Sequence, residues 1–347
     1  MPRKAMLALC SILAAIIIAG CGASPKPKIA VLLPEKYNTP DGMVLAPDGN
    51  IYLNIPNFSD SNYPAKVLKI DASDRITEVV TLPAHPDTGK AGPLGIEIGP
   101  QGNLYVADNQ GMFGRNDYKS RLLRVNMKNG KALGCDVLVT GFIQANAVSY
   151  HKGSIYVTET SLDTEADPMP SGVYRFKLSE FKGKPIQLKP AAADEHLFVK
   201  FLTHVKDWPV GANGMAFDAK GDLYVCNFGE ASILRYILDP RGKAAAPEVV
   251  AKENGMKSTD GMKIDPATGD IYVADFVANA VHKVCPKSGK VTTVWQNEDN
   301  SGGIGGLLDR PSEVCIRGNK IYVANIDLAL TGNKYDAPHT ISVIKLK

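Results

Sequence analysis

The sequence predicts an all-β protein, a six-bladed β-propeller with four antiparallel strands in each blade. One observation is a pattern that returns six times: a short turn, an apolar strand, a tight hairpin rich in Gly and Asn, and a second strand built around Tyr and Val. Another is the spacing of the anchor tyrosines, at 53, 51, 68, 48 and 50 residues: Tyr52, Tyr105, Tyr156, Tyr224, Tyr272 and Tyr322. A period of about 50 residues is typical of a propeller blade.

The strands of each blade can be assigned in order. The six inner hairpins read TPDGMVLAPDGNIYLN, GPLGIEIGPQGNLYVADN, QANAVSYHKGSIYVTET, GANGMAFDAKGDLYVCNF, STDGMKIDPATGDIYVADF and RPSEVCIRGNKIYVANI. Their Gly-containing dipeptides stand where tight hairpins need positive φ. The outermost strands are predicted in ITEVVTLP, CDVLVTGF, HLFVKFLT, PEVVAKE and KVTTVWQ.

The ring is expected to close in its last blade. The sixth copy is followed by only one further strand, TISVIKLK, so its outer partner is expected at residues 29–33, near the other end of the chain. Pairing the two ends in one blade would hide strand edges that could otherwise pair with other chains. The prediction is a single domain over residues 28–347 with a large shared core.

The first twenty residues stand outside the repeats. Arg3 and Lys4 precede an apolar run over residues 5–19, and small residues precede Cys21. The run is shorter than the roughly 20 apolar residues that a membrane span needs. We therefore expect a lipoprotein signal over residues 1–20, acylation of Cys21 and a tether over residues 21–27. An ordinary secretory signal is the alternative.

This leader predicts a cell-envelope protein attached to a membrane only through its N-terminal lipid, on the periplasmic side of the outer membrane or outside the cell. Removal of the leader with Arg3 and Lys4 lowers the formal net charge from +3 to +1, so no nucleic-acid partner is expected. We expect a monomer. Four cysteines remain and allow either disulfides, in three complete pairings, or buried free thiols: Cys135, Cys226, Cys285 and Cys315. No CxxC pair occurs, which argues against a thiolate zinc site.

Chain direction places polar residues at one mouth of the central channel. The residues just before the inner strands are expected there: Asp41, Leu94, Asn146, Asn213, Asp260 and Pro311. The second strands run back, so the residues that end them return to the same rim: Asn54, Asp108, Glu159, Asn227, Asp275 and Asn325. The hairpin turns lie at the opposite mouth. A single Asp or Asn before Gly is usually a turn residue. Here, however, these residues stand at equivalent positions before their inner strands, which predicts that they form one site.

Two carboxylates and two amide carbonyls suit a hard divalent cation, Ca²⁺ first, with Mg²⁺ or Mn²⁺ as alternatives. The predicted ligands are Asp41, Asn146, Asn213 and Asp260. The candidates for supporting them or for contacting a substrate are Gln144, Asp108, Glu159, Asn227 and Asp275, although such residues more often cap turns. The six histidines are scattered without HExxH spacing, and no GxSxG motif occurs.

Two of the repeats, GANGMAFDAKGDLYVCN and STDGMKIDPATGDIYVAD, resemble the Asn-Gly and Asp-Gly metal motifs of the regucalcin and gluconolactonase group of six-bladed propellers. The resemblance extends over most of the predicted mature chain. It implies that Asn213, Asp260 and Asn146 bind the metal and that Asp41 stands where the family usually has Glu. Gln144 stands where sugar-acid lactonases of the family often carry Arg, which argues against an aldonic acid lactone.

The resemblance implies hydrolysis of a lactone or related ester, in which the metal polarises the carbonyl and Asp260 activates water as general base. The alternative is a non-catalytic propeller that binds a partner protein or glycan, because segments such as IYVADFVANAVHKV resemble NHL-type repeats. Two loops are expected at the polar mouth, over residues 161–172 and 297–311, either as substrate-selecting lids or as solvated connections.

Overall fold

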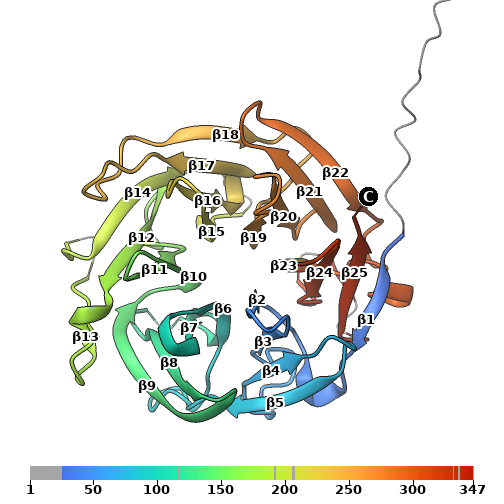
Figure 1. The fold of residues 1–347 in the computed structure, drawn as a ribbon, viewed down its shortest axis with the longest axis horizontal. Helices are drawn as coiled ribbons and strands as arrows, with labels where there is room; N and C mark the ends of the chain where they lie inside the picture. The colour runs from blue at the N-terminus through green and yellow to red at the C-terminus, as the bar shows by residue number, and fades with distance from the viewer. Residues whose placement is uncertain are drawn as a thin grey trace, which may run out of the picture.

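The chain forms a ring of six β-sheets around a central axis (Figure 1). In this computed structural model the described residues are 26–115, 117–190, 193–204, 208–330, 332–334 and 337–346. The expected leader and Cys21 lie outside them. The helices in these ranges are short 3₁₀ turns, and none is long and apolar enough to cross a membrane.

Each of the first five blades is built from strands that follow one another outward from the axis. Blade 1 contains β2 (Met43–Leu45), β3 (Ile51–Ile55), β4 (Lys66–Ile70) and β5 (Ile76–Thr81). Blade 2 contains β6 (Pro93–Ile98), β7 (Leu104–Asp108), β8 (Ser120–Lys128) and β9 (Lys131–Phe142). Blade 3 contains β10 (Ala145–His151), β11 (Ser154–Glu159), β12 (Met169–Lys177) and β14 (Leu197–Thr203). Blade 4 contains β15 (Ala212–Phe217), β16 (Leu223–Asn227), β17 (Ser232–Tyr236) and β18 (Glu248–Lys252). Blade 5 contains β19 (Met262–Ile264), β20 (Ile271–Asp275), β21 (Ala280–Cys285) and β22 (Lys290–Gln296).

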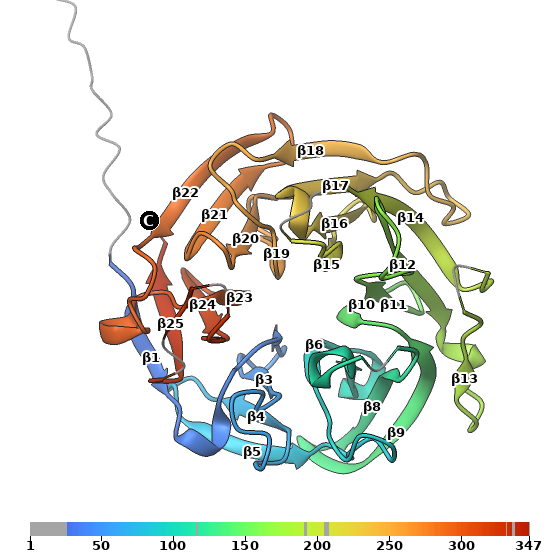
Figure 2. The ribbon, with the colours of Figure 1, turned by 180° about the vertical axis from the view of Figure 1, so that it is seen from behind.

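Blade 6 joins the two ends of the described chain. It contains β23 (Pro311–Arg317), β24 (Lys320–Asn325), β25 (Thr340–Lys345) and, outermost, β1 (Lys28–Leu32). β1 pairs antiparallel with β25, which Figure 2 shows from behind. The predicted closure is confirmed, although the strand begins and ends one residue earlier than the expected 29–33.

Blade 3 departs from the regular pattern, which explains the long tyrosine spacing before blade 4. Residues 178–196 connect β12 to β14, and within them β13 (Ile186–Gln187) adds a parallel fifth strand beside β9 of blade 2. The loop predicted over residues 161–172 ends earlier than expected. Met169 already begins β12, where it pairs with Thr203 of β14.

The hydrophobic core consists of layers between neighbouring blades. One layer joins Tyr52 and Val67 of blade 1 to Ile96, Leu104 and Leu123 of blade 2. All six anchor tyrosines are buried. A single blade cannot cover its own faces, so burial of apolar area between blades, at about 25 cal/mol per Å², stabilises the closed ring.

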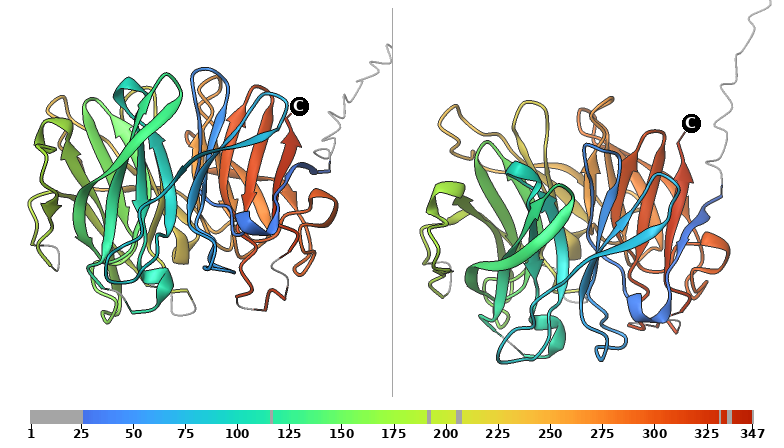
Figure 3. Two further views of the ribbon diagram at one scale, coloured as in Figure 1. Left: turned by 90° about the horizontal axis from the view of Figure 1, so that it is seen from below. Right: turned by 60° about the horizontal axis from the view of Figure 1, so that its bottom comes forward.

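The four cysteines of the domain are free thiols in the described structure, with Cys226 and Cys315 buried and Cys135 and Cys285 half-buried. The sequence left disulfides and free thiols open, and the structure shows free thiols. The strands run across the thickness of the ring, so that turns collect at its two mouths (Figure 3).

Candidate functional site

Strand pairing determines which residues share a level along the axis. One residue of each inner strand lies directly opposite the anchor tyrosine: Val44, Glu97, Ser149, Ala216, Lys263 and Cys315. Three residues earlier on each inner segment is the rim position, held by Asp41, Leu94, Asn146, Asn213, Asp260 and Ser312. Five of these are the residues predicted for the rim.

The prediction of Pro311 for the sixth rim position is wrong by one residue. The last inner hairpin is shorter than assumed, because Ile316 pairs with Ile321 and leaves four residues between them. In blade 2 the corresponding pair, Ile98 and Leu104, leaves five. The shorter turn moves Ser312 to the rim.

The glycine after the rim residue is required by packing between blades. A Cβ atom on Gly42 would lie 2.2 Å from the carbonyl oxygen of Leu94, and one on Gly214 would lie 2.4 Å from that of Asp260. The Gly214 N–H also donates to the Asp260 carbonyl at 3.2 Å. In these Asp-Gly and Asn-Gly pairs the missing side chain therefore allows the inner strands to approach closely.

Asp41, Asn213 and Asp260 come together at this mouth, although they belong to blades 1, 4 and 5. The Asn213 amide acts on the Asp260 carboxyl group in the direction that lowers its pKa, but this effect is smaller than those that raise it. Burial, and then the negative charges of Asp41 and Glu313, raise the pKa of Asp260 well above its usual value. Burial also raises the pKa of Asp41 to about 7, against a hydrogen bond from Ser312 that lowers it. The buried carboxyl groups thus lack sufficient positive charge nearby.

Asn146 holds the equivalent rim position on β10. Its carbonyl oxygen would lie 2.5 Å from a Cβ atom on Gly95 of the preceding blade. Within the described ranges no polar contact joins its side chain to the other three predicted ligands. The structure thus brings three of the four together and places the fourth on the same rim.

The supporting candidates hold the loops that lead into the inner strands. Asp108 is buried, accepts the Gly92 N–H at 2.6 Å and forms an ion pair with Arg121 at 2.5 Å. Glu159 accepts the N–H groups of Ile143 at 2.8 Å and Gln144 at 2.5 Å. Asp275 accepts the N–H groups of Lys257 and Ser258, and Asn227 accepts the Thr203 hydroxyl. These residues therefore cap turns, as the sequence allowed. The Gln144 side chain lies beside Gly111.

The channel also holds an ion pair that the sequence did not predict. Lys263 Nζ lies 2.7 Å from Glu313 Oε2. Burial raises the pKa of Glu313, while the Lys263 charge lowers it. Glu313 follows the rim residue of blade 6, where four other blades have glycine. Once the length of the last hairpin is known, this exception is visible in the sequence.

An apolar cluster borders the rim on the side of blades 4 to 6. Phe228, Phe276 and Ile326 each follow the last residue of a second strand and are buried against one another. The Trp208 ring packs on them, with its centroid 5.9 Å from that of Phe228 and 6.0 Å from that of Phe276. Since the second strands end at this mouth, the cluster forms an apolar wall beside the carboxylates.

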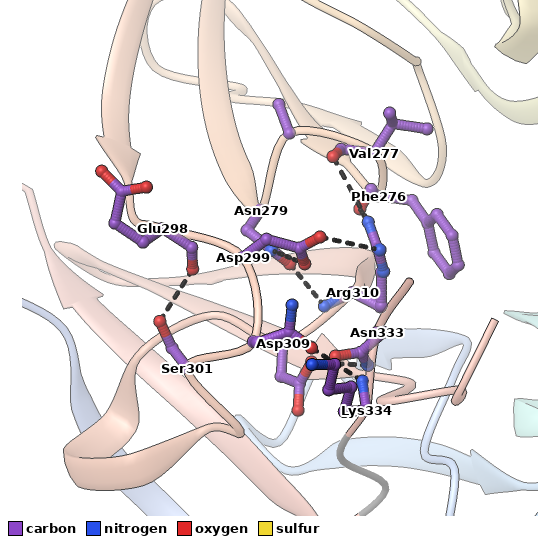
Figure 4. A network of polar contacts seen from close by, with 12 residues as sticks. Phe276, Val277, Asn279, Glu298, Asp299, Ser301, Asp309, Arg310, Asn333 and Lys334 are labelled. Carbon is purple, nitrogen blue, oxygen red and sulfur yellow. Dashed lines mark hydrogen bonds and ion pairs between the residues drawn. The ribbon is translucent and has the colours of Figure 1, made fainter. Parts of the chain in front are cut away.

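A polar network fixes this wall to the loop over residues 297–310 (Figure 4). The Arg310 guanidinium donates to the carbonyl oxygens of Phe276 and Val277, both at 3.3 Å, and lies over the Phe276 ring. It also pairs with Asp299 at 3.3 Å, and the Arg310 N–H donates to Asn279 at 2.8 Å. The loop is therefore tied to blade 5 at its base.

The donor atoms at the rim fit a hard divalent cation. No group of three or more His, Cys, Asp or Glu side chains in the described parts of the chain is arranged to hold a metal. Asp41, Asp260 and Asn213 nevertheless offer only oxygen ligands, as Ca²⁺ prefers. The raised pKa values of both carboxyl groups show that added positive charge would be favourable here.

Comparison with known proteins gives the family and the fold. The family model described as the SMP-30/gluconolactonase/LRE-like region matches residues 86–300. No curated protein matches the chain in sequence.

Among solved structures, a gluconolactonase from Xanthomonas campestris is similar at 14% identity, with 96% of this chain and 99% of that chain covered and a TM-score of 0.58. A luciferin-regenerating enzyme is similar at 12% identity, with 93% and 97% covered and a TM-score of 0.60. A PQQ-bound aldose sugar dehydrogenase from Streptomyces coelicolor is similar at 14% identity, with 93% and 99% covered and a TM-score of 0.57. At these identities the likeness shows the fold alone, and the named activities differ.

Proposed function

Because the chain belongs to the SMP-30/gluconolactonase/LRE-like family, we propose that it is a divalent-metal-dependent hydrolase of a lactone or related ester. The family supports a lactonase-type function in general. The metal, the residues that carry the reaction and the kind of lactone are our proposal.

The observation that supports the proposal is that Asp41, Asn213 and Asp260 hold equivalent rim positions at one mouth of the channel, where the charge of Asp41 raises the pKa of Asp260. Three blades contribute one oxygen-bearing side chain each, so a single ion could contact all three. We assign Asn146 as a fourth ligand from blade 3. Ca²⁺ is the cation that suits this donor set best, with Mg²⁺ and Mn²⁺ as alternatives.

The bound metal would act as a Lewis acid that polarises the substrate carbonyl. The Asp260 carboxylate takes a proton from a water molecule, whose oxygen attacks the carbonyl carbon. The ring C–O bond then breaks, and the proton passes from Asp260 to the leaving alkoxide oxygen, which gives a hydroxy acid. Asn213, on the neighbouring blade, would bind the metal beside Asp260.

The apolar wall suggests the substrate class. The half-buried Trp208 ring packs on the buried Phe228 and Phe276 beside the carboxylates, and its exposed part would contact an apolar ring or alkyl group of the substrate. Gln144 supplies no positive charge for a sugar acid. We therefore propose an aliphatic or aromatic lactone rather than an aldonic acid lactone.

We also propose that the protein is held on a membrane of the cell envelope by a lipid on Cys21. The sequence before the ring supports this anchor, and Cys21 itself lies outside the described residues. Mass spectrometry of the protein purified from membranes tests it. A diacylglyceryl group on Cys21 is the expected result, and an unmodified chain in the soluble fraction would contradict it.

The hydrolase proposal is tested by assaying the purified protein, with Ca²⁺ and after chelation, against aliphatic, aromatic and sugar lactones. Calcium-dependent hydrolysis of the apolar lactones is the expected result. No bound metal and no turnover on any lactone would instead favour the alternative, a propeller that binds a partner protein or glycan.

A further inference from the structure

Two adjoining cavities lie at the mouth opposite the carboxylates, between blades 3 and 4. Their volumes are about 710 and 530 Å³, and both are lined by Arg175, Lys177, Arg241 and Gly242. The larger one also reaches the inner hairpins at Lys152 and Lys220. We call the two together the hairpin cleft.

The larger cavity of the hairpin cleft concentrates positive charge, whereas the smaller one is also lined by Glu180 and Glu195. The larger cavity is lined by five cationic side chains from four segments: Lys152, Arg175, Lys177, Lys220 and Arg241. Its one acidic lining residue, Asp239, already lies 3.6 Å from Arg241. No ion pair of Lys152, Lys177 or Lys220 is found in the part of the chain that the structure describes. The whole chain has a formal net charge of only +3, so the excess of positive side chains is local to this cavity.

Some of these groups are held in fixed positions. The Arg175 guanidinium donates to the Gly242 carbonyl at 2.9 Å and lies over the Phe198 ring at 4.6 Å. The His151 ring stacks on Phe217 with centroids 4.2 Å apart. Its Nε2 atom is buried and has no hydrogen-bond partner among the described residues. The His151 ring is therefore held by stacking in the wall of the cavity.

A basic surface is often only solvated, but these cations line a concave space with a fixed guanidinium and hydroxyl groups from Ser154 and Ser179. A planar guanidinium binds two oxygens of a phosphoryl group at once, and lysines add point charges around it. The arrangement suits a ligand with more than one negative charge.

We propose that the hairpin cleft binds a small polyanion that carries phosphoryl groups. The phosphoryl group could belong to a free molecule or to a lipid headgroup. β1 runs toward the carboxylate mouth, because its last residue, Leu32, pairs with the first residue of β25. The chain therefore enters the ring from the hairpin side, and a membrane anchor before β1 would leave the cleft facing the lipid. The proposal does not depend on the hydrolase activity.

The test is calorimetric titration of the full chain with inorganic pyrophosphate. The double variant Lys152→Gln, Lys220→Gln is expected to bind at least about tenfold more weakly, since it loses two charge-assisted contacts. The matched control is Lys128→Gln, Lys131→Gln, which removes the same charge from the β8–β9 turn at the same mouth. The control is expected to bind like the wild type. Arg175→Lys keeps the charge but loses the planar guanidinium that can bind two oxygens, so it is expected to weaken binding as well.

Vesicles of phosphatidylglycerol distinguish the two sources. Pyrophosphate binding together with cleft-dependent recruitment to these vesicles identifies a lipid headgroup, whereas pyrophosphate binding without recruitment identifies a free phosphorylated molecule. Absence of pyrophosphate binding, or equal loss in the control variant, would overturn the proposal. Hydrolase activity of the double variant separates this result from the proposed reaction.

Discussion

The two mouths of the channel are built from the same repeats but carry opposite charge. At the carboxylate mouth Asp41, Asp260 and Glu313 are largely buried, and their pKa values are raised. At the hairpin mouth Lys152 and Lys220 are exposed on turns. The rim residues are fixed where inner strands touch, whereas hairpins differ in length from blade to blade. The pairing of the inner strands therefore fixes the carboxyl groups at the carboxylate mouth. The sequences of the turns determine the binding surface at the hairpin mouth.

The largest expected effect at the carboxylate mouth is that of Asp260→Asn. Loss of the general base should lower kcat for the lactone substrate by about 10²-fold or more. The matched control is Asp265→Asn, which changes a half-buried carboxylate in the hairpin of the same blade, at the other mouth. A variant at position 260 with wild-type kcat would show that the reaction, if any, takes place elsewhere.

Calcium removal should make stability depend on pH. The folded-state pKa of Asp41 is about 7 against 3.8 for the ordinary group, so the folded metal-free protein holds a proton that the unfolded chain releases. Its stability should therefore be fully present at about pH 4 and fall as the pH rises to about 7. Saturating Ca²⁺, at 100 times Kd, should restore about 2.7 kcal/mol. Thermal melting at pH 5 and pH 8 measures both effects, and an equal Ca²⁺ shift at the two pH values would contradict the assignment.

The Lys263–Glu313 ion pair should weaken cation binding, because it already supplies a positive charge in the channel. Lys263→Met is expected to raise the Ca²⁺ affinity about tenfold, as removal of a nearby like charge is worth about 1.4 kcal/mol at an intermediate dielectric. Lys66→Met, which removes a lysine paired with Glu78 at the outer part of blade 1, is the control. Unchanged affinity in calorimetry would place the cation away from this pair.

A second effect of about tenfold concerns the apolar wall. Trp208→Ala should raise KM for aliphatic or aromatic lactones by about tenfold, from lost burial of roughly 1–2 kcal/mol. KM for a small unsubstituted lactone should change little. An equal rise for both substrates would mean that Trp208 supports the fold of the rim rather than the substrate.

Much of the fold could be predicted from the sequence because one structural unit repeats. The tyrosine period gave the six blades, and the single strand after the last copy gave the closure by β1. The connection over residues 178–196 could not be predicted, since β13 pairs with a strand of another blade and has no signal of its own.

The site was predicted less completely for a specific reason. A turn one residue shorter than assumed moved the sixth rim position from Pro311 to Ser312 and concealed Glu313 in the glycine position. Lys263 is three residues from Asp260, but its pairing across blades depends on ring geometry. The hairpin cleft was missed because Lys152 and Lys220, which precede equivalent hairpin glycines, meet cations from β12 and from the loop at Arg241 that follow no repeat pattern.

The most direct test of the account is calorimetric titration of Ca²⁺ into the wild type and into Asp41→Asn and Asp260→Asn. We predict one Ca²⁺ ion for each wild-type chain and loss of binding in both variants, since blades 1 and 5 would contribute to one site. Wild-type protein that binds no Ca²⁺, Mg²⁺ or Mn²⁺, or variants that bind as tightly as the wild type, would contradict it.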